Sequence, residues 1–166
     1  MTQDVELEQD ITTFWSLLFE IIADMEKRLF AHMAEHGLTP PQFYVLKTLV
    51  EHGGRCRIGQ IAEDHHLTNA TMTGLIKRME AMSPALVCRE QSASDGRAVD
   101  VMLTEAGQQR FLDVQEGILN QVRMVLELLP TDERRLIIER IQTYFGLLGQ
   151  LFPVISRTAV PDAADS

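Results

Sequence analysis

The feature that most constrains this chain is the breadth of apolar surface on the helices predicted at its two ends. Across residues 6–36 apolar side chains recur at spacings of three and four, and Leu17, Phe19, Phe30 and Met33 lie outside that stripe. A helix predicted over residues 131–152 is apolar over a similarly wide arc. A surface helix of a monomer needs only one stripe, so this breadth predicts contact with more than one neighbour. Burial of apolar surface stabilises by about 25 cal/mol per Å², and we therefore expect a homodimer assembled through both ends.

The residues between these ends predict a compact order of three helices followed by a β-hairpin. Helices are expected at residues 40–52, 58–65 and 69–82, strands at 55–57, 86–90 and 99–103, and a long helix at 105–129. In the last strand, Asp100 lies on the side opposite Val101. Thr39, Thr68, Thr104 and Thr131 are good N-caps for the helices that follow them.

The helix predicted at 69–82 separates two kinds of side chain. One stripe is apolar at positions i, i+3, i+4 and i+7, formed by Met72, Leu75, Ile76 and Met79. The opposite side carries small or hydrogen-bonding residues, which allow a helix to approach another surface closely. Three helices and a hairpin in this order form a winged helix-turn-helix, so the predicted fold is mainly α, with the terminal helices forming a dimerisation domain.

This order of elements suits double-stranded DNA. A helix fits the major groove and presents side chains to the base edges. A hairpin whose polar loop, residues 91–98, carries Arg97 can reach the neighbouring minor groove or backbone. Seven Lys and Arg residues balance seven Asp and Glu residues between Pro40 and Thr104, so the net charge of −9 arises from the flanks. A segment without net charge can still bind phosphate groups if its arginines cluster on one face.

Several motifs in register resemble the multiple antibiotic resistance regulator (MarR) family. Residues 38–46, LTPPQFYVL, are similar to its LT-x-x-Q-x-x-x-L opening, and residues 67–80 are similar to its recognition helix. Residues 86–89, 95–97 and 103–107 match its wing and the start of the next helix. The stretch Ala81–Ala85 is two residues longer than is usual in the family and lacks its glycine, which alters the turn into the wing.

The resemblance implies roles for individual side chains. It places Asn69, Thr71, Thr73 and Lys77 against bases or phosphates, and Arg97 at the wing tip. Asp95 would orient the wing by pairing with Arg78 or Arg97. Further DNA-binding candidates are Arg78 and Arg89. The alternative is that these arginines form structural ion pairs or are simply exposed to solvent, and that Thr71 and Thr73 are ordinary surface residues.

The resemblance also implies regulation by a small molecule, because relatives commonly bind small aromatic or phenolic anions between the dimerisation helices and the DNA-binding lobe. In this chain the predicted crevice is lined by Trp15, Phe19, Ile22, Phe43, Leu46 and Lys47. The alternative is that these apolar groups pack in the core.

Other functional classes find little support. The chain lacks the glycine-rich phosphate loops, the nucleophile elbow and the HExxH motif, so no enzyme activity is expected. His32 and His36 have a metal-ligand spacing, but the helix after the wing has no histidine, so no metal site or cofactor is expected. Cys56 and Cys88 indicate reduced thiols in a cytoplasmic protein rather than a disulfide or redox sensor.

The sequence therefore predicts a DNA-binding transcriptional regulator, with a repressor as the expected kind. The polar, acidic N-terminus is unlike a signal peptide, and no apolar run reaches the length of a membrane span. Residues 1–37 and 105–152 are expected to form the dimerisation region, 38–104 the winged lobe, and 153–166 a frayed tail. The alternative is a winged helix that mediates only protein contacts, because this fold is used both for DNA binding and for protein binding.

Overall fold

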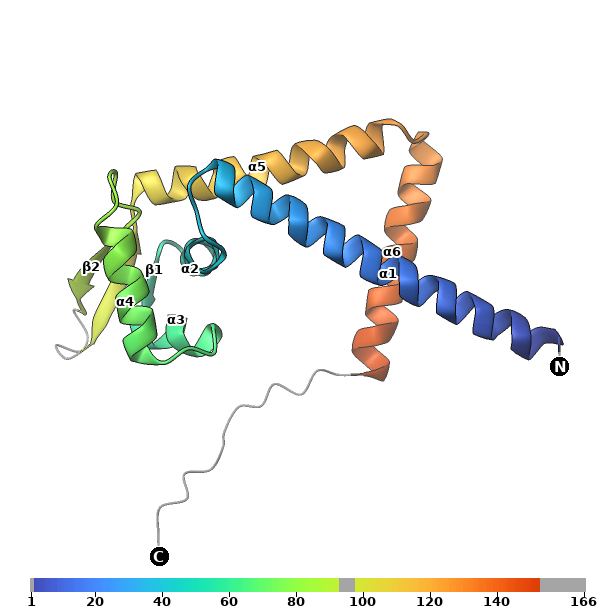
Figure 1. The fold of residues 1–166 in the computed structure, drawn as a ribbon, viewed down its shortest axis with the longest axis horizontal. Helices are drawn as coiled ribbons and strands as arrows, with labels where there is room; N and C mark the ends of the chain where they lie inside the picture. The colour runs from blue at the N-terminus through green and yellow to red at the C-terminus, as the bar shows by residue number, and fades with distance from the viewer. Residues whose placement is uncertain (1, 93–97, 153–166) are drawn as a thin grey trace, which may run out of the picture. The chain divides into compact units, whose positions relative to one another are not determined.

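The computed structural model describes residues 2–92 and 98–152 of the 166-residue chain (Figure 1). The chain divides after Gln121 into two compact units. The first unit contains α1 (Thr2–Glu35), α2 (Pro40–Glu51), β1 (Arg55–Arg57), α3 (Ile58–Asp64), α4 (Asn69–Glu80), β2 (Val87–Gln91), β3 (Val99–Leu103) and most of α5 (Glu105–Glu127). The second unit contains the end of α5 and α6 (Thr131–Leu151). The predicted fold class, a mainly helical chain with a winged helix-turn-helix, is confirmed.

Local signals place most of the helix ends. The backbone N–H of Thr39 donates to Gln42 Oε1 at 2.8 Å, and Thr68 Oγ1 accepts from the Thr71 N–H at 3.2 Å. At α6 the N-cap is Pro130 and not the predicted Thr131. The backbone of Pro130 is extended, and its carbonyl accepts the first helical hydrogen bond, from the Arg134 N–H at 3.0 Å.

Other boundaries differ from the predictions by a few residues. α1 begins at Thr2, four residues earlier than expected, and α4 ends two residues earlier, with Ala81 as its C-cap. The residues that follow α4 reach the wing through a turn that is closed by a 3.1 Å hydrogen bond from the Leu86 N–H to the Met79 carbonyl. The additional residues of this stretch are thereby accommodated outside the helix and the strand.

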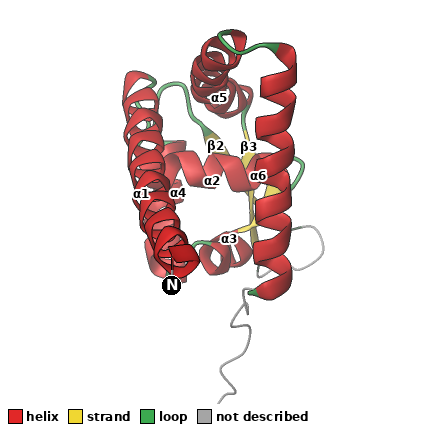
Figure 2. Ribbon diagram, turned by 90° about the vertical axis from the view of Figure 1, so that its right-hand side faces the viewer, coloured by secondary structure: helices red, strands yellow, loops and turns green. Residues whose placement is uncertain are grey.

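The strands of the described residues form one small antiparallel sheet in the order β1–β3–β2 (yellow in Figure 2). Cys56 pairs with Val101 across β1 and β3, and Arg89 pairs with Val101 across β2 and β3. The hydrophobic core lies between this sheet and the helices α2, α3 and α4. The four predicted stripe residues of α4 are all buried in this core. The outer face of α4 is therefore determined by the packing of its inner face.

The start of α5 is seated closely against the base of the wing. Gly107 is buried, and a Cβ atom built on it would lie 2.1 Å from the Leu86 carbonyl oxygen. Thr104 Oγ1 donates to the Ala85 carbonyl at 2.7 Å and accepts from the Gly107 N–H at 3.0 Å. One turn later, Phe111 stacks on Phe43 of α2 with ring centroids 5.3 Å apart. These contacts join α5 to the lobe without room for an additional methyl group.

Both units leave large apolar side chains exposed. On α1 the exposed fractions include 61% for Trp15 and 52% for Phe19, and α6 has no buried residue. The end of α1 that lies beside α2 is different, because Met33 is fully buried. No helix in the described part of the chain combines the length and apolar character that a membrane crossing requires. The predicted division into a dimerisation region and a winged lobe remains a prediction, and the predicted tail lies outside the described residues.

Candidate DNA-binding surface

The outward face of α4 is the centre of the candidate site. Because the apolar stripe points into the core, Asn69, Thr71 and Lys77 are exposed, while Thr73 and Gly74 are partly exposed. Figure 1 shows α4 beside the β2–β3 hairpin, so the helix and the wing belong to the same lobe. Asn69, Thr73 and Lys77 are spaced four residues apart and share one side of the helix, and Thr71 and Arg78 flank them.

Hydrogen bonds on this face limit what each hydroxyl group can offer. Thr73 Oγ1 donates to the Asn69 carbonyl at 2.7 Å, so its remaining capacity toward a partner is that of an acceptor. Thr71 Oγ1 lies 2.9 Å from Thr68 Oγ1, and either atom can be the donor. In the major groove, acceptors on a helix match the amino groups of adenine and cytosine. The Asn69 side chain adds both a donor and an acceptor.

Two cations follow on the last turn of α4. Lys77 and Arg78 are both exposed, and among the described residues neither one forms an ion pair. Cations of this kind can contact phosphate groups, and such contacts supply most of the sequence-independent affinity for DNA. Gly74 lies between the threonines and these cations, and because it has no side chain, nothing projects from the helix at that position.

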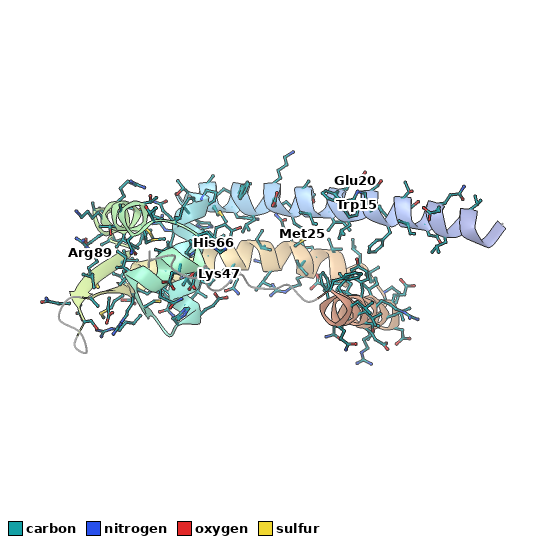
Figure 3. All side chains as sticks on the ribbon, turned by 90° about the horizontal axis from the view of Figure 1, so that it is seen from below. Trp15, Glu20, Met25, Lys47, His66 and Arg89 are labelled. Atoms are coloured by element: carbon teal, nitrogen blue, oxygen red, sulfur yellow. The ribbon has the colours of Figure 1, made fainter. Side chains whose placement is uncertain are left out.

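Arg89 is held differently from these two cations, because it is bound to the end of α4. Its Nη2 and Nε atoms lie 2.8 and 2.9 Å from Glu80 Oε2, and its backbone N–H donates to Glu80 Oε1 at 3.2 Å. About a third of each side chain is exposed. This geometry corresponds to the structural ion-pair alternative, in which Arg89 links the recognition helix to strand β2. Figure 3 labels its position at the wing end of the lobe.

A second ion pair crosses the sheet and was not anticipated from the sequence. Arg55 Nη2 lies 2.8 Å from Asp100 Oδ2, and Asp100 is only 7% exposed. Among the described residues, Asp100 Oδ1 has no hydrogen-bond partner. The simple alternation of β3 gave no signal for this pair, because β1 and β3 are more than forty residues apart and their register is a tertiary property. Arg57, on the same strand as Arg55, is exposed.

The two predicted wing-tip residues, Asp95 and Arg97, lie outside the described residues. Their proposed roles, contact with DNA and orientation of the wing, remain predictions.

Comparison with known proteins decides the family. The family model described as MarR matches residues 38–99, which cover the described helices α2 to α4 and most of the wing. The repressor MdtR of Bacillus subtilis is 30% identical over 112 residues, which span 68% of each chain. The chain belongs to the MarR family. It is accordingly a DNA-binding transcriptional regulator with a winged helix-turn-helix.

Solved structures agree with this assignment of the MarR-family chain. A MarR family protein from Bacillus stearothermophilus superposes with a TM-score of 0.71 at 26% identity, covering 86% of this chain and 97% of the other. A point mutant of MepR from S. aureus, bound to an oligodeoxyribonucleotide, has the same fold, with a TM-score of 0.64 at 20% identity over 81% of this chain and 97% of that protein.

The residues predicted to line an effector crevice of this MarR-family chain are not brought together. Trp15 precedes the buried Met33 by 18 residues, about 27 Å along α1, and Figure 3 shows it well apart from Lys47. Leu46 is fully buried and Phe43 is 7% exposed, stacked on Phe111. Within one chain, Phe43 and Leu46 pack in the core, which corresponds to the alternative given above. The effector crevice remains a prediction.

The other three residues predicted to line the crevice, Phe19, Ile22 and Lys47, are all exposed. Phe19 and Ile22 share the exposed side of α1 with Trp15, whose ring centroid lies 4.6 Å from that of Phe19. Lys47 is exposed and forms an ion pair with Glu51 one turn further along α2.

The histidines and cysteines that the sequence singled out have ordinary surroundings. His32 Nδ1 lies 3.1 Å from Glu35 Oε2, and its Nε2 lies 2.9 Å from Gln121 Nε2 on α5. The described residues contain no group of three or more His, Cys, Asp or Glu side chains arranged to hold a metal ion. Burial raises the pKa of the Cys56 thiol, and the nearby carboxylates of Asp64 and Asp100 act in the same direction.

Proposed function

We propose that this MarR-family protein is a repressor that binds a pseudo-palindromic operator as a homodimer, with α4 of each subunit in the major groove. The observation that carries the proposal is the composition of the outer face of α4. Hydrogen-bonding side chains at Asn69, Thr71 and Thr73 lead to two cations that no described carboxylate neutralises. Side chains of this kind read base edges and phosphates.

The homodimer is supported by the exposed apolar faces of α1 and α6. A monomer would leave side chains such as Trp15, Phe19, Ile141 and Phe145 in water, with exposed fractions between 51% and 61%. Large apolar patches of this kind mark interaction sites, and permanent dimers commonly bury more than about 2,000 Å². A two-fold dimer presents two copies of α4, so the half-sites should be centred about 10 bp apart. Repression is supported by the relative MdtR, which is named a repressor.

A winged helix that only contacts other proteins is the less favoured function. The cores of protein-binding surfaces are enriched in aromatic residues and depleted in charged ones. The exposed face of α4 has no aromatic residue and carries Lys77 and Arg78. The same face therefore suits a polyanion better than a protein partner.

The test is a mobility-shift titration on the DNA that flanks the protein's own gene, repeated at increasing salt concentration. Lys77→Ala should weaken binding and lower the slope of log affinity against log salt by about 1 per subunit, because one phosphate contact is lost. Lys27→Ala is the matched control, since Lys27 is exposed on α1 and lies outside the proposed interface. Equal affinity and slope for Lys77→Ala and the wild type would contradict the proposed role of α4.

Regulation by a small aromatic effector is the last part of the proposal. It is supported by membership of the family, and a ligand with a differential affinity of about 1–3 kcal/mol for two subunit arrangements would change DNA affinity roughly 5- to 150-fold. Calorimetric titration of salicylate-like compounds with and without operator DNA tests the coupling, because equal affinities in the two titrations would rule it out.

A further inference from the structure

A hollow of about 280 Å³, partly open to solvent, lies in the first unit on the inner side of α4. Its walls come from the first turns of α2, from the turn between α3 and α4, and from the inner side of α4. This face of α2 carries Pro40 and Tyr44 and is not the face that carries Phe43, which packs on α5. A cavity of about 150 Å³ holds benzene, so this hollow has room for a substituted ring or a small bicyclic molecule.

The walls of the hollow are apolar and without charge. None of the eight described residues that line it is Asp, Glu, Lys or Arg. His65 is the titratable imidazole among them, and burial lowers its pKa, so that the ring is neutral near pH 7. An anion or cation in the hollow would lose its hydration without gaining a counter-charge, which is costly.

Two of the residues that line the hollow carry a polar group. His65 Nε2 lies 3.0 Å from Thr48 Oγ1, and no described residue forms a hydrogen bond with the other ring nitrogen, Nδ1. The Tyr44 side chain is 39% exposed and adds a hydroxyl group. Both groups can exchange hydrogen bonds with a hydroxyl or carbonyl group.

We propose that this hollow binds an uncharged molecule of one or two aromatic rings with a single hydroxyl or carbonyl group, and that its binding changes the affinity of α4 for DNA. The regulatory half of the proposal rests on the proposed function. Met72 and Leu75 line the hollow and are also two of the four buried residues that seat α4 on the core. A ligand in contact with both side chains therefore acts on the support of the recognition helix.

The experiment uses 2-naphthol as the probe and the anion 2-naphthoate as its charge control. Calorimetry on the full chain should give one 2-naphthol per chain and at least tenfold weaker binding of 2-naphthoate. In a spectrum of the methionine methyl groups, 2-naphthol should shift Met72 and leave Met124, which is 60% exposed on α5, unchanged. No binding of 2-naphthol, or equal binding of the two compounds, would overturn the proposed site.

Two variants locate the site further. Leu67→Trp should fill the hollow and weaken 2-naphthol binding at least tenfold, because Leu67 lines the hollow and is 39% exposed, so that its replacement does not disturb the core. Glu63→Trp places the same side chain on the exposed surface of α3 and should bind 2-naphthol like the wild type. His65→Phe keeps a ring but removes the polar nitrogen and should weaken binding several-fold. Unchanged binding in Leu67→Trp would refute the location.

The coupling to DNA is measured separately by repeating the mobility shift with saturating 2-naphthol. A change of at least fivefold in DNA affinity is expected for the wild type and no change for Leu67→Trp. A wild type that binds 2-naphthol with no change in DNA affinity would refute the regulatory half. A wild type that binds no DNA would refute the proposed function, while the calorimetric result without DNA would still decide the site.

Discussion

Replacing Gly107 by alanine should destabilise the protein, although the same replacement normally stabilises a helix. Alanine is favoured over glycine in a helix interior by about 1 kcal/mol. At Gly107, however, the new Cβ atom would lie 2.1 Å from the Leu86 carbonyl oxygen and 3.0 Å from Leu103 Cδ1. The first obstacle is backbone and cannot rotate away, so α5 or the base of the wing must move by about 1 Å to restore ordinary contact.

The size of the effect follows from what that movement breaks. The Thr104 N–H donates to the Leu86 carbonyl at 3.2 Å, and Thr104 Oγ1 donates to the Ala85 carbonyl at 2.7 Å. Each bond contributes about 1 kcal/mol, and overpacking typically costs about 1–3 kcal/mol. After allowance for the favourable helix propensity, Gly107→Ala should lower the free energy of unfolding by about 2–4 kcal/mol.

Urea unfolding followed by circular dichroism measures this effect. All variants are compared at one protein concentration, because the apparent stability of the proposed dimer depends on concentration. Gly74→Ala is the matched control: its Cβ atom would meet only Arg78 Nη1, at 3.8 Å, so it should gain about 1 kcal/mol. A Gly107→Ala protein as stable as the wild type would show that α5 does not approach the wing as closely as described.

Three further predictions concern the ion pair, a histidine and the thiols. Glu80→Ala should lower the free energy of unfolding by at most about 1 kcal/mol, since the pair with Arg89 is partly exposed. It should nevertheless weaken operator binding in the mobility shift, because strand β2 loses its link to α4. Unchanged binding would argue against a positioning role of this ion pair. Because burial lowers the pKa of His65, the unfolded chain takes up a proton at higher pH than the folded chain. The free energy of unfolding should therefore fall as the pH is lowered through the ordinary histidine pKa of about 6.5, and His65→Asn should show a shallower fall; parallel curves would contradict this. With a thiol reagent at pH 7.5, the native protein should react at the partly exposed Cys88 before the buried Cys56, whose raised pKa keeps its thiol protonated. Mass spectrometry that shows faster labelling of Cys56 would refute this order of reactivity.

Much of the fold could be predicted because its signals are local. The stripe of α4 and the caps at Thr39 and Thr68 lie within a few residues of the structure that they specify, and the structure contains them all. The outer face of α4 followed from the same periodicity, since a helix that buries one stripe must expose the opposite one. The polar residues predicted to meet DNA could therefore be named from the sequence.

Other parts of the site could not be predicted, because they depend on pairs of residues distant in the sequence. The burial of Asp100 requires Arg55, which lies 45 residues away on another strand. The predicted crevice combined residues of α1 and α2 because the resemblance to the family implied a site between these elements. In the structure, α1 contacts α2 and Met33 near its end is buried, whereas Trp15 lies several turns of helix away and is exposed (Figure 3).

By itself, the sequence determined which segments form helices and strands, to within a few residues at their ends, which face of α4 is apolar, and that the helices at both ends carry apolar residues outside a single stripe. Periodicity and capping act over a few residues, so these properties can be obtained without coordinates. Only the tertiary structure decided that Glu80 engages Arg89, that Gly107 has no room for a methyl group, and that a hollow lies behind α4. Those features depend on distances of a few ångströms between elements, which close packing sets and one-dimensional patterns do not contain.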